Sequence, residues 1–513
     1  MIALSTEEAG RALGLRPLAA PVTGVCIDSR QVRPGDLFVA LQGERFDGHD
    51  FVAEALAAGA SGALVEGRRW TDERTGELVR PVPSGAAPTL DPRRMVYPVD
   101  DTLVALSVLA REVRRKSAAT MVAVTGSVGK TSTKDLISAM AGRARRVVVT
   151  AANQNNEVGV PLTLLAIEPD TELVVVEMGM RGPGQIEALA RVVEPDIGVV
   201  TNVHPVHLEL LGTLENVAKA KAELLGCLRP GGVAVIPADC GLLGPYAAAA
   251  SCRVVRFSFG STAVVGDGAE VHGFLRSDGP KGTAVLCLHW PEGEAEVEVP
   301  FGSRHRLENA VAAAAACYAA GLPMDRCVAG VADARFSRSR GDIMRLPGVT
   351  LIDDTYNASP AAVRAALDDL VDLAAESGGR PVAVLGDMLE LGRGAQDYHE
   401  ATGAYAAEAG VGALWGVGPL SRYTVEGFRR ARAWGAEKET SLPLRAGNLR
   451  SADEASPVLA GLHRGDVVLL KASRSMGLEV LVQHIAEEAA AGRWLGPSEA
   501  DADKDGSTEG SQA

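Results

Sequence analysis

Short apolar runs alternate with amphipathic stretches through the middle of the chain. The runs Met121–Val124, Leu173–Val176, Ile197–Val200 and Val233–Ile236 contain no polar residue. Strands that are apolar throughout are typical of parallel sheets buried on both faces, because helices cover them on each side. A helical stretch from Thr131 to about Gly142 follows the first run. The pattern predicts an α/β unit built on a parallel sheet.

The alternation of apolar strands and amphipathic helices is weaker in the residues that precede this α/β unit. Strand-like runs at Gly24–Ile27 and Asp36–Leu41 precede a helical stretch at Phe51–Ala58. Residues from Glu66 to Met95 are rich in Arg, Pro and Gly and show no period. We expect a long surface loop there, and then a helix from Thr102 to Arg115.

After the central unit the pattern changes again. Alternating runs at Ala284–Leu288 and Glu296–Val299 indicate an antiparallel patch within residues 253–300. A third α/β unit begins near Phe336. Its predicted strands are Thr350–Ile352, Val382–Leu385 and Val467–Leu470.

A chain of 513 residues is too long for one compact core, so several domains are expected. We predict an α/β protein with domains at residues 1–98, 99–336 and 337–495. Residues 496–513 are rich in Ser, Asp and Gly without apolar anchors, and this composition predicts a disordered tail.

Composition narrows the function classes. The net charge is 51 − 65 = −14, which argues against a nucleic-acid-binding protein. The seven Cys include no C-x-x-C pair, so we expect buried free thiols rather than a disulfide scaffold or zinc site. The N-terminus lacks the pattern of a signal peptide, and the apolar stretch Ala310–Ala320 is too short to span a bilayer. We expect a soluble cytoplasmic protein that is not integral to a membrane, and nothing in the sequence demands more than a monomer.

A glycine-rich loop lies between the first apolar run and its helix. Gly126 and Gly129 allow the backbone to turn its N–H groups toward an anion, and the helix N-terminus adds partial positive charge. Lys130 can reach the β- and γ-phosphates, and the Thr131 hydroxyl can bind Mg²⁺. The spacing G-x-x-G-K-T is two residues shorter than the usual phosphate loop, and an ordinary turn before a helix is the alternative. We predict an ATP site at Gly126, Ser127, Gly129, Lys130, Thr131 and Ser132.

Other polar residues follow the apolar runs. Glu177 ends one strand, where a carboxylate suits a metal ion or caps the next helix, and His207 follows another strand. Lys221 lies in a helix that we would otherwise assign to the surface. The segments Asn153–Pro161 and Asp353–Pro360 carry polar groups suited either to a ligand or to turns and helix caps.

Taken together, these segments resemble the Mur ligase family over about residues 20–490. The N-terminal matches to its uridine-nucleotide domain are Asp28–Arg30, Pro34–Ala40 and Phe46–His49. Four stretches are similar to the member that joins D-Ala-D-Ala to UDP-N-acetylmuramoyl-tripeptide: Asn155–Thr163, Tyr356–Pro360, Leu385–Gly392 and Lys471–Arg474. The family implies a small N-terminal α/β domain that binds UDP, a central parallel-sheet ATPase domain with a phosphate loop, and a C-terminal Rossmann-like domain.

The resemblance also implies roles for individual residues. It gives ATP contacts to His305, Asn309, Arg340 and Asp354 besides the phosphate loop, although Arg306 stands where the family has the first Asn of its H-N-x-x-N motif. Two Mg²⁺ would be held by Thr131, Glu177, His207 and a carbamate on Lys221, and Lys130, Lys221 and His207 would be catalytic. The implied substrate contacts are Ser29, Asn155, Asn156, Tyr356, Asn357, Lys471 and Arg474.

The implied reaction is ATP-dependent amide formation through an acyl phosphate, in the synthesis of a cell-wall precursor. Three alternatives stay open at this point. They are the neighbouring ligase that adds the third amino acid, a folylpolyglutamate synthase-like amide ligase, and a phosphate-loop NTPase that acts as a switch or motor. The Asp28–Arg30 domain argues against the second, and the third would need a side chain placed to activate water.

Overall fold

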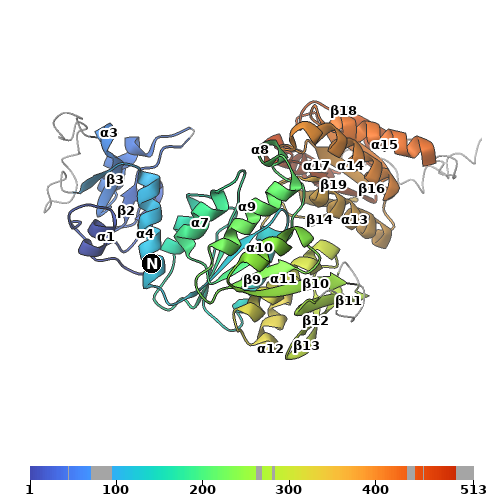
Figure 1. The fold of residues 1–513 in the computed structure, drawn as a ribbon. Coiled ribbons are helices and arrows are strands. Elements are labelled where there is room, and N and C mark those ends of the chain that lie inside the picture. Colours follow the sequence, from blue (N-terminus) through green and yellow to red (C-terminus); the bar gives the residue numbers. More distant parts are fainter. Residues whose placement is uncertain are drawn as a thin grey trace, which may run out of the picture.

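The computed structural model describes residues 1–43, 45–70, 95–260, 268–279, 283–435, 445–454 and 456–492. These residues form three sheets in succession along the chain, each with its own helices. The N-terminal unit stands apart from the other two, which lie against each other (Figure 1). The predicted three-unit α/β architecture is therefore confirmed. The boundaries at 98, 336 and 495 stay predictions, and the predicted tail lies outside the described residues.

The N-terminal unit is a four-stranded parallel sheet in the order β1-β2-β3-β4. The expected loop over residues 66–95 is wrong at its start, because Glu66 ends a strand and Gly67–Trp70 form a short helix. Trp70 is buried in the apolar cluster under this sheet, and that packing overrides the local composition. Residues 71–94 lie outside the described part. The elements are α1 (Thr6–Ala12), β1 (Val25–Cys26), β2 (Leu37–Val39), α2 (Val52–Ala57), β3 (Gly62–Glu66), α3 (Gly67–Trp70) and β4 (Val96–Val99).

Helix α4 (Thr102–Lys116) joins the N-terminal unit to the middle unit. The Asp101 carboxylate caps its start by accepting the backbone N–H groups of Leu103 and Val104. Its apolar face, with Leu106 and Leu109, belongs to one buried cluster that includes side chains of both units. The two units therefore share apolar packing along this helix.

The middle unit is a nine-stranded sheet in the order β13-β12-β11-β10-β9-β8-β5-β7-β6. In β5, Met121 and Ala123 face one buried cluster whereas Val122 and Val124 face the other, as expected of a sheet covered on both sides. Strands β6 to β9 are parallel, which confirms the prediction. The first part contains β5 (Thr120–Thr125), α5 (Lys130–Ala141), β6 (Val147–Val149), α6 (Gly159–Leu165), β7 (Leu173–Glu177), α7 (Gln185–Val193), β8 (Ile197–Val200), α8 (Leu208–Leu211), α9 (Leu214–Gly226), β9 (Val233–Pro237) and α10 (Gly244–Ala249).

The rest of the middle unit extends this sheet. Strands β11, β12 and β13 are antiparallel, as predicted, but β10 (Arg253–Gly260) pairs in parallel with both β9 and β11 and so continues the parallel part. Among the described residues, no helix is long and apolar enough to cross a membrane, the Ala-rich α11 included. The remaining elements are β11 (Val271–Asp278), β12 (Ala284–Trp290), β13 (Gly293–Val299), α11 (Arg304–Ala319) and α12 (Met324–Cys327).

The C-terminal unit is a six-stranded sheet in the order β14-β15-β19-β16-β17-β18. Only the pair β14–β15 is antiparallel, so the unit is Rossmann-like, with an apolar cluster on each face. Its elements are β14 (Asp342–Leu346), β15 (Val349–Asp354), α13 (Pro360–Ser377), β16 (Pro381–Gly386), α14 (Ala395–Glu408), β17 (Ala413–Val417), α15 (Ser421–Gly435), β18 (Arg445–Leu449), α16 (Ser456–Gly461), β19 (Asp466–Lys471) and α17 (Glu479–Ala491).

Candidate functional site

The glycine-rich loop lies at the carboxyl end of β5, where it turns directly into α5. Gly129 has φ +81°, and a Cβ atom added there would lie 2.2 Å from the Asn309 Oδ1 atom. Gly126 has φ +152°, and its Cβ would lie 1.9 Å from the Thr201 hydroxyl oxygen. Both positions therefore require glycine, for backbone conformation and for space.

The end of the neighbouring strand β8 holds this loop in place. The Thr201 hydroxyl donates to the Val128 carbonyl at 2.7 Å, and the Asn202 Oδ1 atom accepts the Val128 N–H at 2.9 Å. The His204 N–H donates to the Ser127 hydroxyl oxygen at 2.8 Å. The protein's own hydrogen bonds thus fix the backbone of the loop, which is the arrangement that electrostatic stabilisation requires.

Lys130 begins α5 and turns its ammonium group back over the loop. Nζ donates to the Gly126 carbonyl at 2.9 Å and to the Ser127 carbonyl at 3.2 Å. Burial lowers the pKa of Lys130, with Glu177 opposing this effect and Arg340 adding to it. No carboxylate forms an ion pair with Nζ among the residues that the structure describes. The ammonium group is therefore available to an incoming phosphate.

Thr131, Glu177 and Asn155 come together beside the loop. The Thr131 hydroxyl donates to Glu177 Oε2 and the Asn155 amide donates to Glu177 Oε1, each at 2.8 Å. Glu177 ends β7 and is almost fully buried. Two oxygen ligands of Mg²⁺ in adjacent octahedral positions, each about 2.0–2.1 Å from the ion, lie roughly this far apart. The pair therefore fits the protein share of a magnesium site that is completed by phosphates and water.

Within the described chain, no three His, Cys, Asp or Glu side chains are grouped so that they could hold a metal ion by themselves. A Mg²⁺ ion usually takes one or two protein carboxylates together with substrate phosphates, and Glu177 would be such a carboxylate.

Lys221 is not on the surface, and the assignment that its helix position suggested is wrong. Only 1% of the residue is exposed, because the side chain points from α9 into the middle unit. Burial, and then the positive charge of Lys130, lowers the pKa of Lys221 well below its ordinary value. A neutral amine is thereby favoured there.

His207 lies between the middle and C-terminal units. It precedes α8 with φ +53°, and its Nδ1 atom contacts a Glu390 carboxylate oxygen of the C-terminal unit. Burial lowers the pKa of His207, while Glu390 opposes this effect. The imidazole is therefore close to both units.

The C-terminal unit contributes a second cluster of polar side chains near its contact with the middle unit. The Lys471 ammonium donates to Asp354 Oδ2 at 2.5 Å and to the Asn357 carbonyl at 3.0 Å. The guanidinium of Arg340 lies 3.9 Å from the centroid of the Tyr356 ring. Burial raises the pKa of Asp354, while Lys471 opposes this effect. The guanidinium of Arg474 lies 5.9 Å from the same ring centroid.

The start of α11 faces the C-terminal unit as well. His305 Nδ1 lies 3.4 Å from Asp369 Oδ2 of α13. Burial lowers the pKa of His305 to about 3, and burial raises the pKa of Asp369 to about 8. Both shifts favour the neutral form of the side chain. Asn309 lies against the phosphate loop, where its Oδ1 accepts the Thr133 hydroxyl at 3.3 Å.

Comparison with known proteins identifies the family. The profile described as Mur ligase middle domain matches residues 124–317, that of the glutamate ligase domain matches 337–474, and that of the catalytic domain matches 21–114. The UDP-N-acetylmuramoyl-tripeptide–D-alanyl-D-alanine ligase of Bacillus subtilis is 32% identical, with 91% of this chain and 93% of the relative covered. The chain belongs to the Mur ligase family.

Further relatives agree with this assignment. The ligase of the same name from Mycobacterium bovis is 36% identical over 92% of this chain and 94% of its own. The crystal structure of MurF from Acinetobacter baumannii has a TM-score of 0.78 and 28% identity, with 94% of this chain and 99% of that chain covered. MurF from Thermotoga maritima in complex with ADP has a TM-score of 0.72 and 26% identity, over 91% and 98%.

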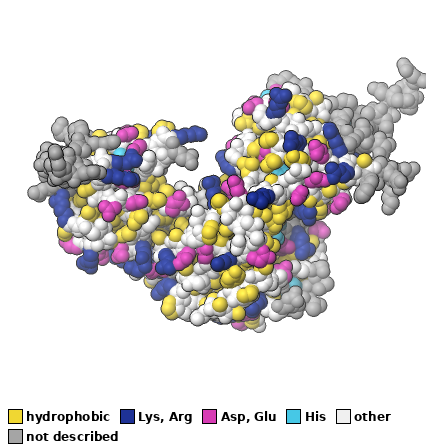
Figure 2. Space-filling view, turned by 45° about the horizontal axis from the view of Figure 1, so that its top comes forward, with side chains coloured by type: hydrophobic (Ala, Val, Ile, Leu, Met, Phe, Trp, Pro, Cys, Tyr) yellow, Lys and Arg dark blue, Asp and Glu magenta, His cyan; other side chains and the backbone are white. Residues whose placement is uncertain are grey.

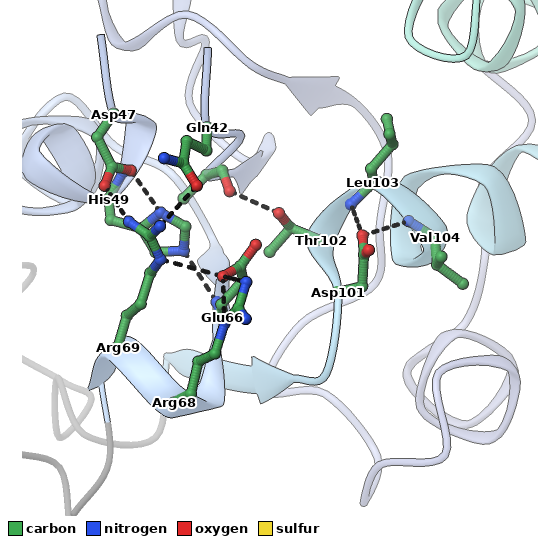
Figure 3. A network of polar contacts seen from close by, with 11 residues as sticks. Gln42, Asp47, His49, Glu66, Arg68, Arg69, Asp101, Thr102, Leu103 and Val104 are labelled. Atoms are coloured by element: carbon green, nitrogen blue, oxygen red, sulfur yellow. Dashed lines mark hydrogen bonds and ion pairs between the residues drawn. The ribbon is translucent and has the colours of Figure 1, made fainter. Parts of the chain in front are cut away.

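In this Mur ligase the N-terminal unit holds its own polar network (Figure 3). His49 is buried; its Nδ1 atom contacts Asp47 at 2.6 Å and its Nε2 atom accepts the Glu66 N–H at 2.9 Å. Arg69 joins Asp47, Glu66 and Gln42 around this histidine. The family segment Phe46–His49 is thereby fixed to the sheet, and the side chain of Phe46 itself is largely exposed.

Ser29 is on this unit, in a short helical turn after Asp28, and lies apart from the phosphate loop. Figure 2 shows the surface hollowed between the lobe of the N-terminal unit and that of the C-terminal unit. The structure therefore brings together predicted residues of the middle and C-terminal units, whereas Ser29 belongs to the N-terminal unit. An extended substrate would be needed to reach both.

Some predicted residues carry local structure. The Asn156 side chain accepts the N–H groups of Val158 and Gly159 at the start of α6, which is the turn role that the sequence also allowed. Of the seven Cys, all free, only Cys287, Cys317 and Cys327 are fully buried. The expectation of buried thiols is therefore wrong for the other four, which are partly exposed.

Two further residues, Arg306 and Glu390, make contacts that the sequence did not predict. Arg306 replaces the family Asn, and its guanidinium donates to the carbonyls of Arg340 and Gly341 at 2.8 and 3.0 Å and lies 4.6 Å from the Phe336 ring centroid. It thus ties α11 to the link between the middle and C-terminal units. Glu390 lies within a stretch that carried the family resemblance, but its contact with His207 joins residues 183 positions apart.

The glycine requirement of the loop can be tested directly. Gly129→Ala puts a Cβ atom on Asn309 and forces an L-residue into a left-handed conformation, which costs about 1–3 kcal/mol. We expect the affinity for ADP, measured by titration calorimetry, to fall at least tenfold. Gly226→Ala, in α9 with no atom near its Cβ, is the matched control and should bind ADP as the wild type does. Wild-type affinity in Gly129→Ala would contradict the account of the loop.

Proposed function

We propose that this chain is an ATP-dependent ligase that joins D-alanyl-D-alanine to UDP-N-acetylmuramoyl-tripeptide, giving the pentapeptide precursor of peptidoglycan. The observation that carries the proposal is a phosphate loop with the Thr131–Glu177 pair beside it and with Arg340, which lies against Tyr356, close enough to Lys130 to lower its pKa. Relatives named for this reaction, at 32–36% identity over most of their length, support the choice of substrates.

The chemistry follows from the weakness of a carboxylate as an acyl donor. The terminal carboxylate of the tripeptide attacks the γ-phosphate of ATP, which gives an acyl phosphate and ADP. The amine of D-alanyl-D-alanine then attacks the acyl carbon, and the tetrahedral intermediate expels inorganic phosphate. Phosphoryl transfer of this kind depends on positioning and on neutralising charge rather than on covalent help from the protein.

The phosphate loop supplies the positioning. Its backbone N–H groups and the N-terminus of α5 hold the phosphates, and Lys130 neutralises the charge that develops on the transferred group. Thr131 and Glu177 would hold a Mg²⁺ ion, whose chemistry when bound is to neutralise phosphate oxygens. Asn155 keeps the Glu177 carboxylate turned toward Thr131.

Lys221 and His207 would form the second metal position of the site. A buried amine that is kept neutral is nucleophilic enough to add CO₂, and the resulting carbamate is an anion. Such an anion would offset the positive charge of Lys130, which otherwise disfavours a second cation nearby. Two Mg²⁺ ions and a carbamylated Lys221 are therefore part of the proposal.

The C-terminal unit would bind the incoming dipeptide and close the site. Tyr356, Asn357, Lys471 and Arg474 gather at the carboxyl ends of β15 and β19, and Arg340 and Asp354, at the same edge, would face the nucleotide. Ser29 and the Phe46–His49 segment would hold the uridine end of the other substrate across the hollow. We place the reaction in the cytoplasm, where ATP is available, and assign it to a monomer.

A phosphate-release assay tests the proposal. We expect turnover only when ATP, UDP-N-acetylmuramoyl-tripeptide and D-alanyl-D-alanine are all present. The first step needs the tripeptide carboxylate to accept the phosphoryl group, and the second needs the dipeptide amine to accept the acyl group. ATP turnover without either acceptor would indicate a phosphate-loop NTPase. Turnover with a single diamino acid and the shorter UDP-linked dipeptide would indicate the neighbouring ligase, and either result would contradict the proposal.

The role of Lys221 can be separated from that of other lysines. Lys221→Ala should lower kcat at least about 10²-fold, as removal of a charge-stabilising group does. Millimolar formate or acetate should restore part of the activity, because these anions fit the space that the carbamate would fill. Lys219→Ala, on the exposed face of the same helix, is the matched control and should keep wild-type activity. Equal rescue of Lys130→Ala by the same anions would refute a specific carbamate.

A further inference from the structure

The loop Gly386–Gly392, which follows β16, is held by several hydrogen bonds to other parts of the C-terminal unit. Asp387 accepts the N–H groups of Leu420 and Ser421 and the Ser421 hydroxyl, at 3.1, 2.7 and 2.6 Å, and so caps α15. The Met388 N–H donates to His399 Nε2 at 3.0 Å. These contacts anchor the start of the loop inside the C-terminal unit.

The next residues of the loop are fixed as well. The Leu389 N–H donates to the Ser473 hydroxyl at 2.9 Å, and Ser473 N–H donates to the Asp387 carbonyl at 3.1 Å. Glu390 then takes a left-handed backbone conformation, with φ +63°, which non-glycine residues rarely adopt. Strain of this kind persists only where the surrounding structure determines it, and it is frequent at functional positions.

Glu390 is the point at which this loop meets the middle unit. One carboxylate oxygen contacts His207 Nδ1, the other lies 3.6 Å from Arg181 Nε, and the Glu390 carbonyl accepts the Glu209 N–H at 3.1 Å. His207 is left-handed too, with φ +53°. Gly392 lies so close to Glu209 that an added Cβ would be 3.1 Å from its Cα atom. Glu390 and His207, each in a left-handed conformation and each from a different unit, are therefore in direct side-chain contact.

This contact decides which nitrogen of His207 is free. When Nδ1–H is donated to a carboxylate, the Nε2 atom carries the lone pair and can bind a cation. Histidine ligands of metals typically have such a carboxylate partner on the other nitrogen, and its loss typically weakens metal binding 10–100-fold.

We propose that Glu390 is a positioning residue: it holds His207 with Nε2 free for the metal and makes metal binding in the middle unit depend on the docked C-terminal unit. The inference rests on the proposed function through the role of His207. None of the proposed reaction steps uses a residue of the loop Gly386–Gly392. The inference gives this loop a role in positioning His207. Because the loop is rigid within its own unit, any displacement of that unit would withdraw the carboxylate from the imidazole.

The first test reads the imidazole itself, without substrates. In the full chain labelled with ¹⁵N-histidine, the His207 signals are assigned by their loss in His207→Gln. We expect Nδ1 protonated and Nε2 bare in the wild type, a mixture of tautomers in Glu390→Ala, and the wild-type tautomer in Glu390→Gln, whose amide oxygen still accepts. A wild-type tautomer in Glu390→Ala would overturn the proposal.

The second test measures Mn²⁺ affinity by electron paramagnetic resonance in the presence of ADP. We expect Glu390→Ala to weaken Mn²⁺ binding at least tenfold. Glu209→Gln removes the same charge from an exposed residue that contacts Glu390 through its backbone N–H, and it should stay within twofold of the wild type. Unchanged affinity in Glu390→Ala, or in His207→Gln, would overturn the proposal.

The two proposals can fail separately. Neither measurement needs tripeptide, dipeptide or turnover. If both come out as expected while phosphate release does not require the two acceptors, the ligase assignment is wrong and the role of Glu390 stands. If phosphate release requires both acceptors while Glu390→Ala leaves the tautomer and the Mn²⁺ affinity unchanged, the ligase assignment stands and the role of Glu390 is wrong.

Discussion

The hold of β8 on the phosphate loop is the interaction on which the rest of the site depends. Thr201 and Asn202 engage both backbone polar groups of Val128, and the added-Cβ contacts at Gly126 and Gly129 show how closely the loop is packed. Because the loop is fixed in this way, α5 begins at a position from which Lys130 and Thr131 can reach a bound phosphate and its metal ion. A parallel sheet supplies the partners, because the carboxyl ends of β5, β7 and β8 meet at one edge.

The site is rich in positive charge that has few partners within the protein. Burial lowers the pKa values of Lys130 and Lys221; the charge of Lys130 lowers that of Lys221 further, and Arg340 lowers that of Lys130. Burying like charges is unfavourable unless anions join them. Nucleotide phosphates and a carbamate would relieve this cost, so ligand binding and closure of the C-terminal unit are expected to favour each other.

Much of this could be predicted from the sequence. The apolar strands at residues 121, 173, 197 and 233, the Gly126–Thr131 loop and Glu177 at a strand end follow from local patterns, because period and turn chemistry act over a few residues. The burial of Lys221 could not be predicted, because α9 carries the same residue types on both faces. The helix at Gly67–Trp70 and the Glu390–His207 contact could not be predicted for a different reason: both arise from packing between segments far apart in the chain. The roles of individual site residues stay predictions.

The central claim is that the phosphate held by the Gly126–Thr131 loop passes to a carboxylate rather than to water. The most direct measurement uses UDP-N-acetylmuramoyl-tripeptide labelled with ¹⁸O in its terminal carboxylate, followed by mass spectrometry of the inorganic phosphate that is released. Attack by the carboxylate transfers one labelled oxygen to each phosphate as the amide forms. The account predicts phosphate carrying that single ¹⁸O atom, and phosphate without label would contradict it.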